Sequence, residues 1–138
     1  MDRLFLDANV LFSAAYREGA PLQRLWNRKD TELLSSDYAI AEAERHLDAA
    51  QQRRLVDLLR TVRIVPNAPP ANLPEVRSLR VKDVPILAAA IAARATHLIT
   101  GDRRDFGAHF GKRLGGVLIV PPRDYFAHAL RKSSRSRR

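Results

Sequence analysis

The sequence predicts an α/β protein in which helices cover both faces of a central, mostly parallel sheet of about four to five strands. Short apolar runs alternate along the chain with longer segments that have the composition of helices. These runs lack strict alternation of apolar and polar residues, which is typical of strands buried on both faces. The chain has 138 residues and a hydrophobic fraction of 46%, which suits one folded domain.

The first half of the chain supplies three predicted strands, each a short run dominated by Leu, Ile, Val or Phe: Arg3–Leu6, Leu33–Ser35 and Val62–Val65. Helices are predicted between them, most of them opened by Asn, Pro, Ser or Asp: from Val10 after Asn9, from Pro21 to Arg28, from Tyr38 to Ala49 after Ser36 or Asp37, and from Gln51 to Arg60.

The second half begins with a proline-rich segment, residues 66–80, which we predict to be a long irregular connection with one helical turn near residues 75–79. Asp83 then opens the strongest predicted helix, Val84–Ala95, whose first turn accommodates Pro85. The remaining predicted elements are two strands and two helices: His97–Thr100, Val117–Val120, Asp105–His109 and Pro122–Leu130.

We assign residues 1–130 to one domain and residues 131–138 to a basic, disordered tail, because the last eight residues carry five basic groups. The net charge of +9 favours a phosphate-rich partner, nucleic acid above all, against the alternative of a merely solvated basic surface. The absence of cysteine excludes disulfides and thiolate metal sites. With no signal-like N-terminus and no apolar run long enough to span a bilayer, we expect a cytoplasmic protein without a membrane partner.

Four carboxylates follow predicted strands or lie in the first turns of predicted helices: Asp7, Glu42, Asp83 and Asp102. Strand C-termini share one edge of a parallel sheet, and Asp7 and Asp102 follow strands directly. Clustered acidic groups repel, and hard oxygen ligands favour Mg²⁺ or Mn²⁺. Taken singly, each acid has a simpler explanation as a helix cap, a turn residue or a solvated side chain. Their joint placement favours one shared metal site.

The segments around these acids resemble the motifs of the PIN domain family in the family's order. The opening motif is similar to residues 4–11 (LFLDANVL), and the second to residues 36–42 (SDYAIAE). The third is similar to residues 82–90 (KDVPILAAA), and the fourth to residues 98–106 (LITGDRRDF). The closing strand and helix resemble residues 120–126, so the resemblance spans about residues 3 to 126.

The resemblance implies an α/β/α fold and a Mg²⁺- or Mn²⁺-dependent endoribonuclease, with Asp7, Glu42, Asp83 and Asp102 as catalytic and metal-binding residues. Asp7 and Asp102 are the expected direct ligands, and Glu42 and Asp83 complete the site directly or through water. Many bacterial members are VapC-type toxins, so we expect RNA as substrate and a small antitoxin as partner. A homodimer is also expected, through the helices around Trp26 or residues 51–60.

Further residues are assigned supporting roles. Asn9 and Thr100 are expected to hold ligand carboxylates or water, and Asp105 is expected to be an accessory acid; helix capping is the alternative for Asn9 and Asp105. The basic residues next to the motif acids are the expected RNA contacts: Lys82, Arg103 and Arg104. The four histidines are interpreted as structural or surface residues. Trp26 and Tyr38 are interpreted as core or interface residues in preference to base-stacking platforms.

Two other functions are compatible with parts of the sequence. A non-catalytic PIN-like module would bind RNA or protein without using the acids. A small phosphotransferase with an aspartate nucleophile would explain Asp7 at a strand end, but it explains Glu42 and Asp102 less well.

Overall fold

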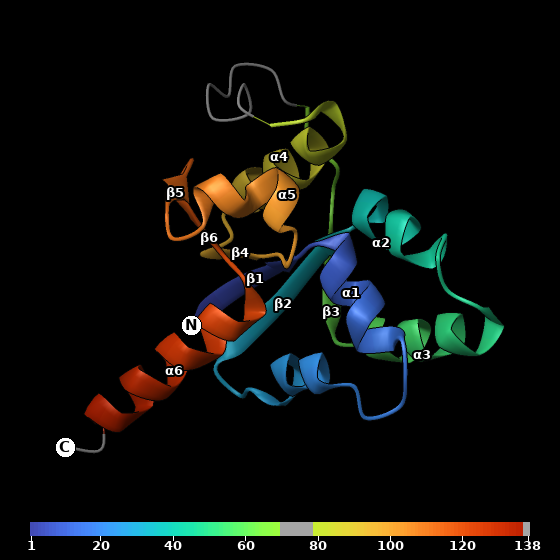
Figure 1. The fold of residues 1–138 in the computed structure, drawn as a ribbon, viewed down its shortest axis with the longest axis horizontal. Coiled ribbons are helices and arrows are strands. Elements are labelled where there is room, and N and C mark those ends of the chain that lie inside the picture. The colour runs from blue at the N-terminus through green and yellow to red at the C-terminus, as the bar shows by residue number, and fades with distance from the viewer. Residues whose placement is uncertain (70–78, 137–138) are drawn as a thin grey trace.

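A computed structural model describes residues 1–69 and 79–136, which form a six-stranded sheet with helices on both sides (Figure 1). The strand order is β3-β2-β1-β4-β6-β5, and every pairing is parallel except that of β5 with β6. The strands are β1 (Asp2–Leu6), β2 (Thr31–Ser36), β3 (Val62–Val65), β4 (His97–Ile99), β5 (Arg113–Leu114) and β6 (Val117–Val120). The predicted mostly parallel sheet is confirmed, and the sixth strand is β5, which is too short to leave a pattern in the sequence.

The centre of the sheet is β1, which pairs with β2 on one side and β4 on the other. Its residues Leu4, Phe5 and Leu6 are fully buried, as are Leu34 on β2 and Leu98 on β4. Consecutive side chains of a strand point to opposite faces, so burial of all three β1 residues requires cover on both faces of the sheet. This is why these strands are continuous apolar runs in the sequence.

The helices divide between the two faces of the sheet according to the direction of the crossovers. Connections from β1 to β2 and from β2 to β3 run one way across the sheet, and those from β3 to β4 and from β4 to β6 run the other way. Right-handed crossovers therefore place α1 (Ala8–Ala15), α2 (Asp37–Glu44) and α3 (Ala49–Leu59) opposite α4 (Val84–Ala92) and α5 (Arg103–Phe106). In Figure 1, α1 to α3 lie together on one side of the sheet, with α4 and α5 on the other.

The remaining elements are 3-10 turns and the last helix: η1 (Pro21–Asn27), η3 (Val81–Asp83), η4 (Gly107–His109) and α6 (Pro122–Ser136). Several predicted helix boundaries differ from the structure, and the helix after Ser36 shows the physical reason most clearly. The helix expected to reach Ala49 ends at Glu44, because Asp48 caps α3 through a reciprocal capping box with Gln51.

The structure also differs from expectation near the C-terminus, where the backbone of α6 continues to Ser136. Part of the tail that was predicted to be disordered from Arg131 is therefore helical. The turn expected near residues 75–79 lies mostly outside the described residues. Within the described part of the chain, no helix is both long and apolar enough to cross a membrane.

Candidate metal centre

The four predicted acids line one cavity at the edge of the sheet where the parallel strands end. Its volume is about 260 Å³. Asp7 follows β1, Glu42 lies on α2, Asp83 immediately precedes α4, and Asp102 precedes α5. Segments that are far apart in the sequence therefore deliver their carboxylates to one place, as the strand-end positions predicted.

Asp7 is held in a fixed orientation by three donors. Its Oδ1 accepts a hydrogen bond from the Ala8 amide at 2.7 Å, and its Oδ2 accepts from the Thr100 hydroxyl at 2.8 Å and the Asn9 amide at 3.1 Å. The side chain is buried, and this burial raises the pKa of Asp7 although the hydrogen bond from Thr100 opposes the shift. The donors thus offset part of the cost of keeping a carboxylate charged inside the protein.

Thr100 and Asn9 connect the two strand ends that carry Asp7 and Asp102. The Thr100 hydroxyl accepts from the Asp102 amide at 3.2 Å, and Asn9 Oδ1 accepts from the Gly101 amide at 2.8 Å. Both residues therefore occupy the orienting positions expected of them, because they touch a proposed ligand and also fix the backbone beside another.

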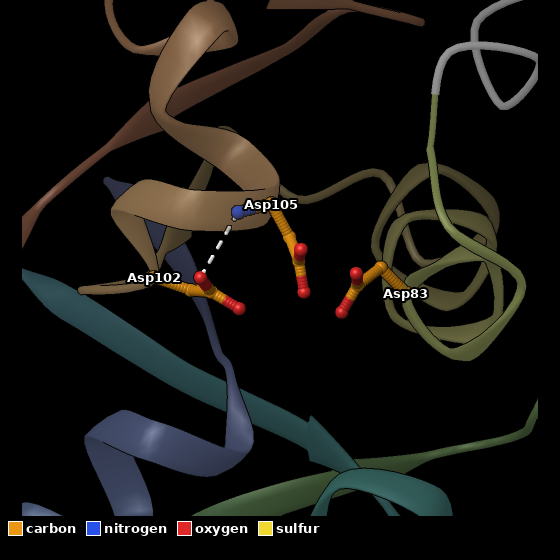
Figure 2. Close-up of side chains that lie close together, drawn as sticks. All are labelled: Asp83, Asp102 and Asp105. Atoms are coloured by element: carbon orange, nitrogen blue, oxygen red, sulfur yellow. Dashed lines mark hydrogen bonds between the residues drawn. The ribbon is translucent and has the colours of Figure 1, made fainter.

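A compact group of carboxylates is formed by Asp83, Asp102 and Asp105 (Figure 2). One oxygen from each lies within 4.8 Å of the others, and the carboxylates of Asp83 and Asp105 face each other. Asp102 also caps α5, because its Oδ1 accepts a hydrogen bond from the Asp105 amide at 3.0 Å. Asp105 therefore lies within the acidic centre itself. The sequence indicates only an accessory role for this residue.

Asp83 and Asp105 shift each other's pKa in opposite directions. Burial, a hydrogen bond to Asp105 and the negative charge of Asp105 together raise the pKa of Asp83 to about 7. The same hydrogen bond lowers the pKa of Asp105, whose carboxylate accepts it. Of the two acids, Asp83 therefore holds a proton more readily, and Asp105 keeps its charge to lower pH.

Two cations also neutralise Asp105, whose side chain is only 1% exposed. Arg80 Nε lies 3.0 Å from its Oδ1, and Lys82 Nζ lies 3.2 Å from its Oδ2. Lys82 lines the cavity, as expected of an RNA contact, but its ammonium group is engaged by an acid of the centre. Arg80 was not predicted from the sequence, because its proximity to Asp105 exists only after η3 and α5 come together.

Glu42 has a different environment from the other acids. It lines the cavity from α2, but its carboxylate forms an ion pair with Arg45, one helical turn later. Among the described residues, both Glu42 and Asp7 lie outside the compact group of carboxylates, although both line the cavity. Arg103 and Arg104, the other predicted RNA contacts, are exposed in the first turn of α5 directly after Asp102.

Apolar and aromatic side chains form the rest of the cavity wall, and the sequence interpretation missed their position. They are Phe12, Tyr38, His46 and Ile86, with Ala8 and Ala43. Tyr38, Glu42 and His46 are spaced four residues apart, so helical periodicity could have placed the two ring residues on the same side as the acid.

The donor atoms of the acidic centre fit a divalent cation. The donors are carboxylate oxygens, the kind that Mg²⁺ and Mn²⁺ prefer. Asp83 Oδ2 is buried and has no hydrogen-bond partner among the described residues, so it retains an unused acceptor. A cation bound there would satisfy this oxygen and relieve the repulsion among Asp83, Asp102 and Asp105.

Comparison with known proteins gives one family match and a structural relative. A PIN domain family model matches residues 3–104. The crystal structure of VapBC2 from Rickettsia felis, bound to a DNA fragment from its promoter, contains a chain with the same fold. That chain is 16% identical, with a TM-score of 0.62 over 86% of this chain and 98% of its own length. No curated protein matches the sequence.

Proposed function

Because this chain belongs to the PIN domain family, we propose that it is a Mg²⁺- or Mn²⁺-dependent endoribonuclease that acts as the toxin of a toxin–antitoxin pair. The observation that carries the proposal is the convergence of Asp7, Glu42, Asp83 and Asp102 on one cavity, with Asp105 added to the group. A basic protein with an acidic cavity suits a polyanionic substrate that is bridged to carboxylates by a cation.

In the proposed centre, Asp83, Asp102 and Asp7 would hold the metal, and Glu42 would join them directly or through water. When bound, the ion supplies a more acidic water and a positive charge for a phosphate oxygen. Thr100 and Asn9 keep Asp7 oriented and favour its charged form. Glu42 can accept a proton from an attacking water once its pairing with Arg45 opens.

Substrate binding is assigned to the basic residues around the acids. Arg103 and Arg104 are exposed beside Asp102 and would contact phosphates flanking the scissile bond. Lys82 would contact RNA from the cavity wall after exchanging its partner Asp105 for a phosphate.

The proposed protein partners are a small antitoxin and a second copy of this chain. The antitoxin proposal rests on the resemblance to VapC-type toxins and on the shared fold with a VapBC2 chain. The homodimer would use the surface of η1 and α3, which are joined by the hydrogen bond from Trp26 Nε1 to the Leu58 carbonyl. Val56 on α3 is 57% exposed there. We also propose a cytoplasmic location, where the RNA substrate is available.

The proposal is tested by incubating the purified chain with end-labelled RNA and Mg²⁺. Cleavage should leave a 5′-phosphate and a 3′-hydroxyl. It should be lost with excess EDTA or with Asp102→Asn, while the thermal unfolding transition is retained. The matched control is Glu44→Gln, an exposed acid on the same helix as Glu42, which should cleave normally. Full activity in EDTA would refute the metal-dependent mechanism.

One observation favours the non-catalytic alternative: Glu42 and Asp105 are already neutralised by Arg45, Lys82 and Arg80. A binding module would keep these pairs closed and would show no carboxylate-dependent metal binding. Calorimetric titration with Mn²⁺ separates the two, because the nuclease should bind the ion and lose that binding with Asp102→Asn.

A further inference from the structure

The cavity that holds the acids has a second, chemically different wall made of rings. Phe12 projects from α1, and Tyr38 and His46 come from the start of α2 and the turn after it. Ile86 on α4 also lines the cavity. One cavity therefore presents carboxylates and flat apolar surfaces together.

The rings are held in defined positions. The hydroxyl group of Tyr38 donates to the Lys82 carbonyl at 2.7 Å, so its polar end is engaged and the ring lines the cavity. The Phe12 and His46 rings meet edge to face, with centroids 6.5 Å apart. Tyr16, the residue directly after α1, has its ring centroid 5.4 Å from that of Phe12, and it is 55% exposed.

Core packing explains only part of this wall. Phe12 and Tyr38 pack against the core, but they are only partly buried, and His46 is exposed, in contrast to fully buried core residues such as Phe5 and Leu87. Apolar surface next to charged groups in an open cavity needs an occupant that has both characters. A nucleotide has both, because an anionic phosphate is joined through a sugar to a flat aromatic base.

We propose that Phe12, Tyr38 and His46 form a subsite for a nucleobase adjacent to the phosphodiester that the acidic centre binds. This inference rests on the proposed nuclease function. The base stacks against the ring wall while its phosphate is directed to Asp83 and Asp102. Aromatic side chains stack on any base, and the imidazole of His46 adds a hydrogen-bonding group at the rim that can favour particular base edges.

The structural consequence is a requirement for an unpaired nucleotide at the cleavage position. A base that is stacked inside a duplex cannot place its face against Phe12 while its phosphate reaches the carboxylates. The subsite would therefore select where the chain cuts, and the acidic centre would perform the cut.

The test is a double-mutant cycle between the protein and the RNA. Wild type and Phe12→Leu are compared on a single-stranded RNA oligonucleotide and on the same oligonucleotide with one abasic ribose beside the scissile bond. Phe12→Leu keeps apolar volume but removes the ring. Each single change should lower kcat/KM about tenfold, and the combination should lower it little further, because the second change removes a contact already lost.

Matched controls separate stacking from folding. Phe126→Leu changes a partly buried phenylalanine on α6 that does not line the cavity, and it should leave kcat/KM and the abasic effect unchanged. If Phe12→Leu unfolds, His46→Ala replaces it, since that side chain is exposed. In a further RNA, 2-aminopurine takes the place of the abasic ribose, and its fluorescence is followed by stopped flow before cleavage. Wild type should quench this fluorescence, and either variant should quench it less.

Each outcome has a clear meaning. The subsite would be overturned if the losses in kcat/KM from Phe12→Leu and from the abasic ribose multiplied independently. It would also be overturned if the abasic effect were unchanged in the Phe12 and His46 variants. Either result would leave the nuclease function intact, and the wall would then face a protein partner. Wild type that neither binds nor cleaves any RNA with Mg²⁺ would overturn the proposed function and the subsite with it.

Discussion

Replacing Asp83 by Asn should stabilise the metal-free protein at pH 8, although it removes a proposed metal ligand. The pKa of Asp83 is raised from 3.8 to about 7 by burial and by the neighbouring Asp105. The folded chain therefore binds this proton more tightly than the unfolded chain, and stability falls as pH rises from about 4 through about 7. Asparagine stays neutral throughout and can still donate a hydrogen bond to Asp105.

The size of the effect follows from the pKa. At about 1.4 kcal/mol per pKa unit, a rise from 3.8 to about 7 sets an upper bound of about 4 kcal/mol. The cavity is open to water, and screening reduces charge penalties of this kind. We therefore expect a gain of about 1–2 kcal/mol in the free energy of unfolding at pH 8, shrinking towards zero at pH 4.

The assay is urea unfolding of both proteins in EDTA at pH 8, 6 and 4. Asp57→Asn is the control, because Asp57 forms an exposed ion pair with Arg60 on α3 and should change stability little at any of these pH values. Saturating Mg²⁺ should reverse the order, since ligand binding stabilises wild type alone. A variant that is less stable than wild type at pH 8, or equally stabilised at pH 8 and pH 4, would refute the reasoning.

Three further predictions concern the surroundings of the acids. Lys82→Met should strengthen Mn²⁺ binding a few-fold in calorimetry, because it removes a cation that competes for Asp105. The same change should raise KM for RNA. Weaker Mn²⁺ binding would show that Lys82 only positions the acid. Thr100→Val should lower metal affinity about 10- to 100-fold, because Asp7 loses a donor, whereas Thr61→Val, at an exposed position, should not. Arg103→Ala should reduce the slope of log Kd for RNA against log salt by about one; an unchanged slope would argue against a phosphate contact.

The fold was predictable because its main determinants are local. The apolar runs at β1, β4 and β6 are continuous because both faces of the sheet are covered. Strand C-termini share an edge, which is why the sequence alone predicts that Asp7 and Asp102 lie together. The two-residue strand β5 was not predictable, since it exists only through its pairing with β6.

The contacts that modify the site were harder to predict, because they join segments distant in sequence. Asp105 follows Asp102 by three residues, yet its cations Arg80 and Lys82 come from the segment before α4. The ring wall was missed for another reason. Residue type alone indicates a core or interface role for Tyr38 and a structural or surface role for His46, whereas both side chains line the cavity with Glu42.

The differences among the acids indicate how the centre is divided. Asp7 receives three donors that hold its orientation and oppose the rise in its pKa that burial causes. Asp83 instead has a pKa raised to about 7, so it keeps a proton up to near neutral pH, and the cations Arg80 and Lys82 pair with Asp105. A divalent ion must displace that proton to use Asp83, so metal binding should release a proton and weaken as pH falls below 7. The motif acids are therefore unequal: Asp7 is buried and held by three donors, whereas the protonation of Asp83 is expected to set how strongly the proposed centre binds a divalent ion.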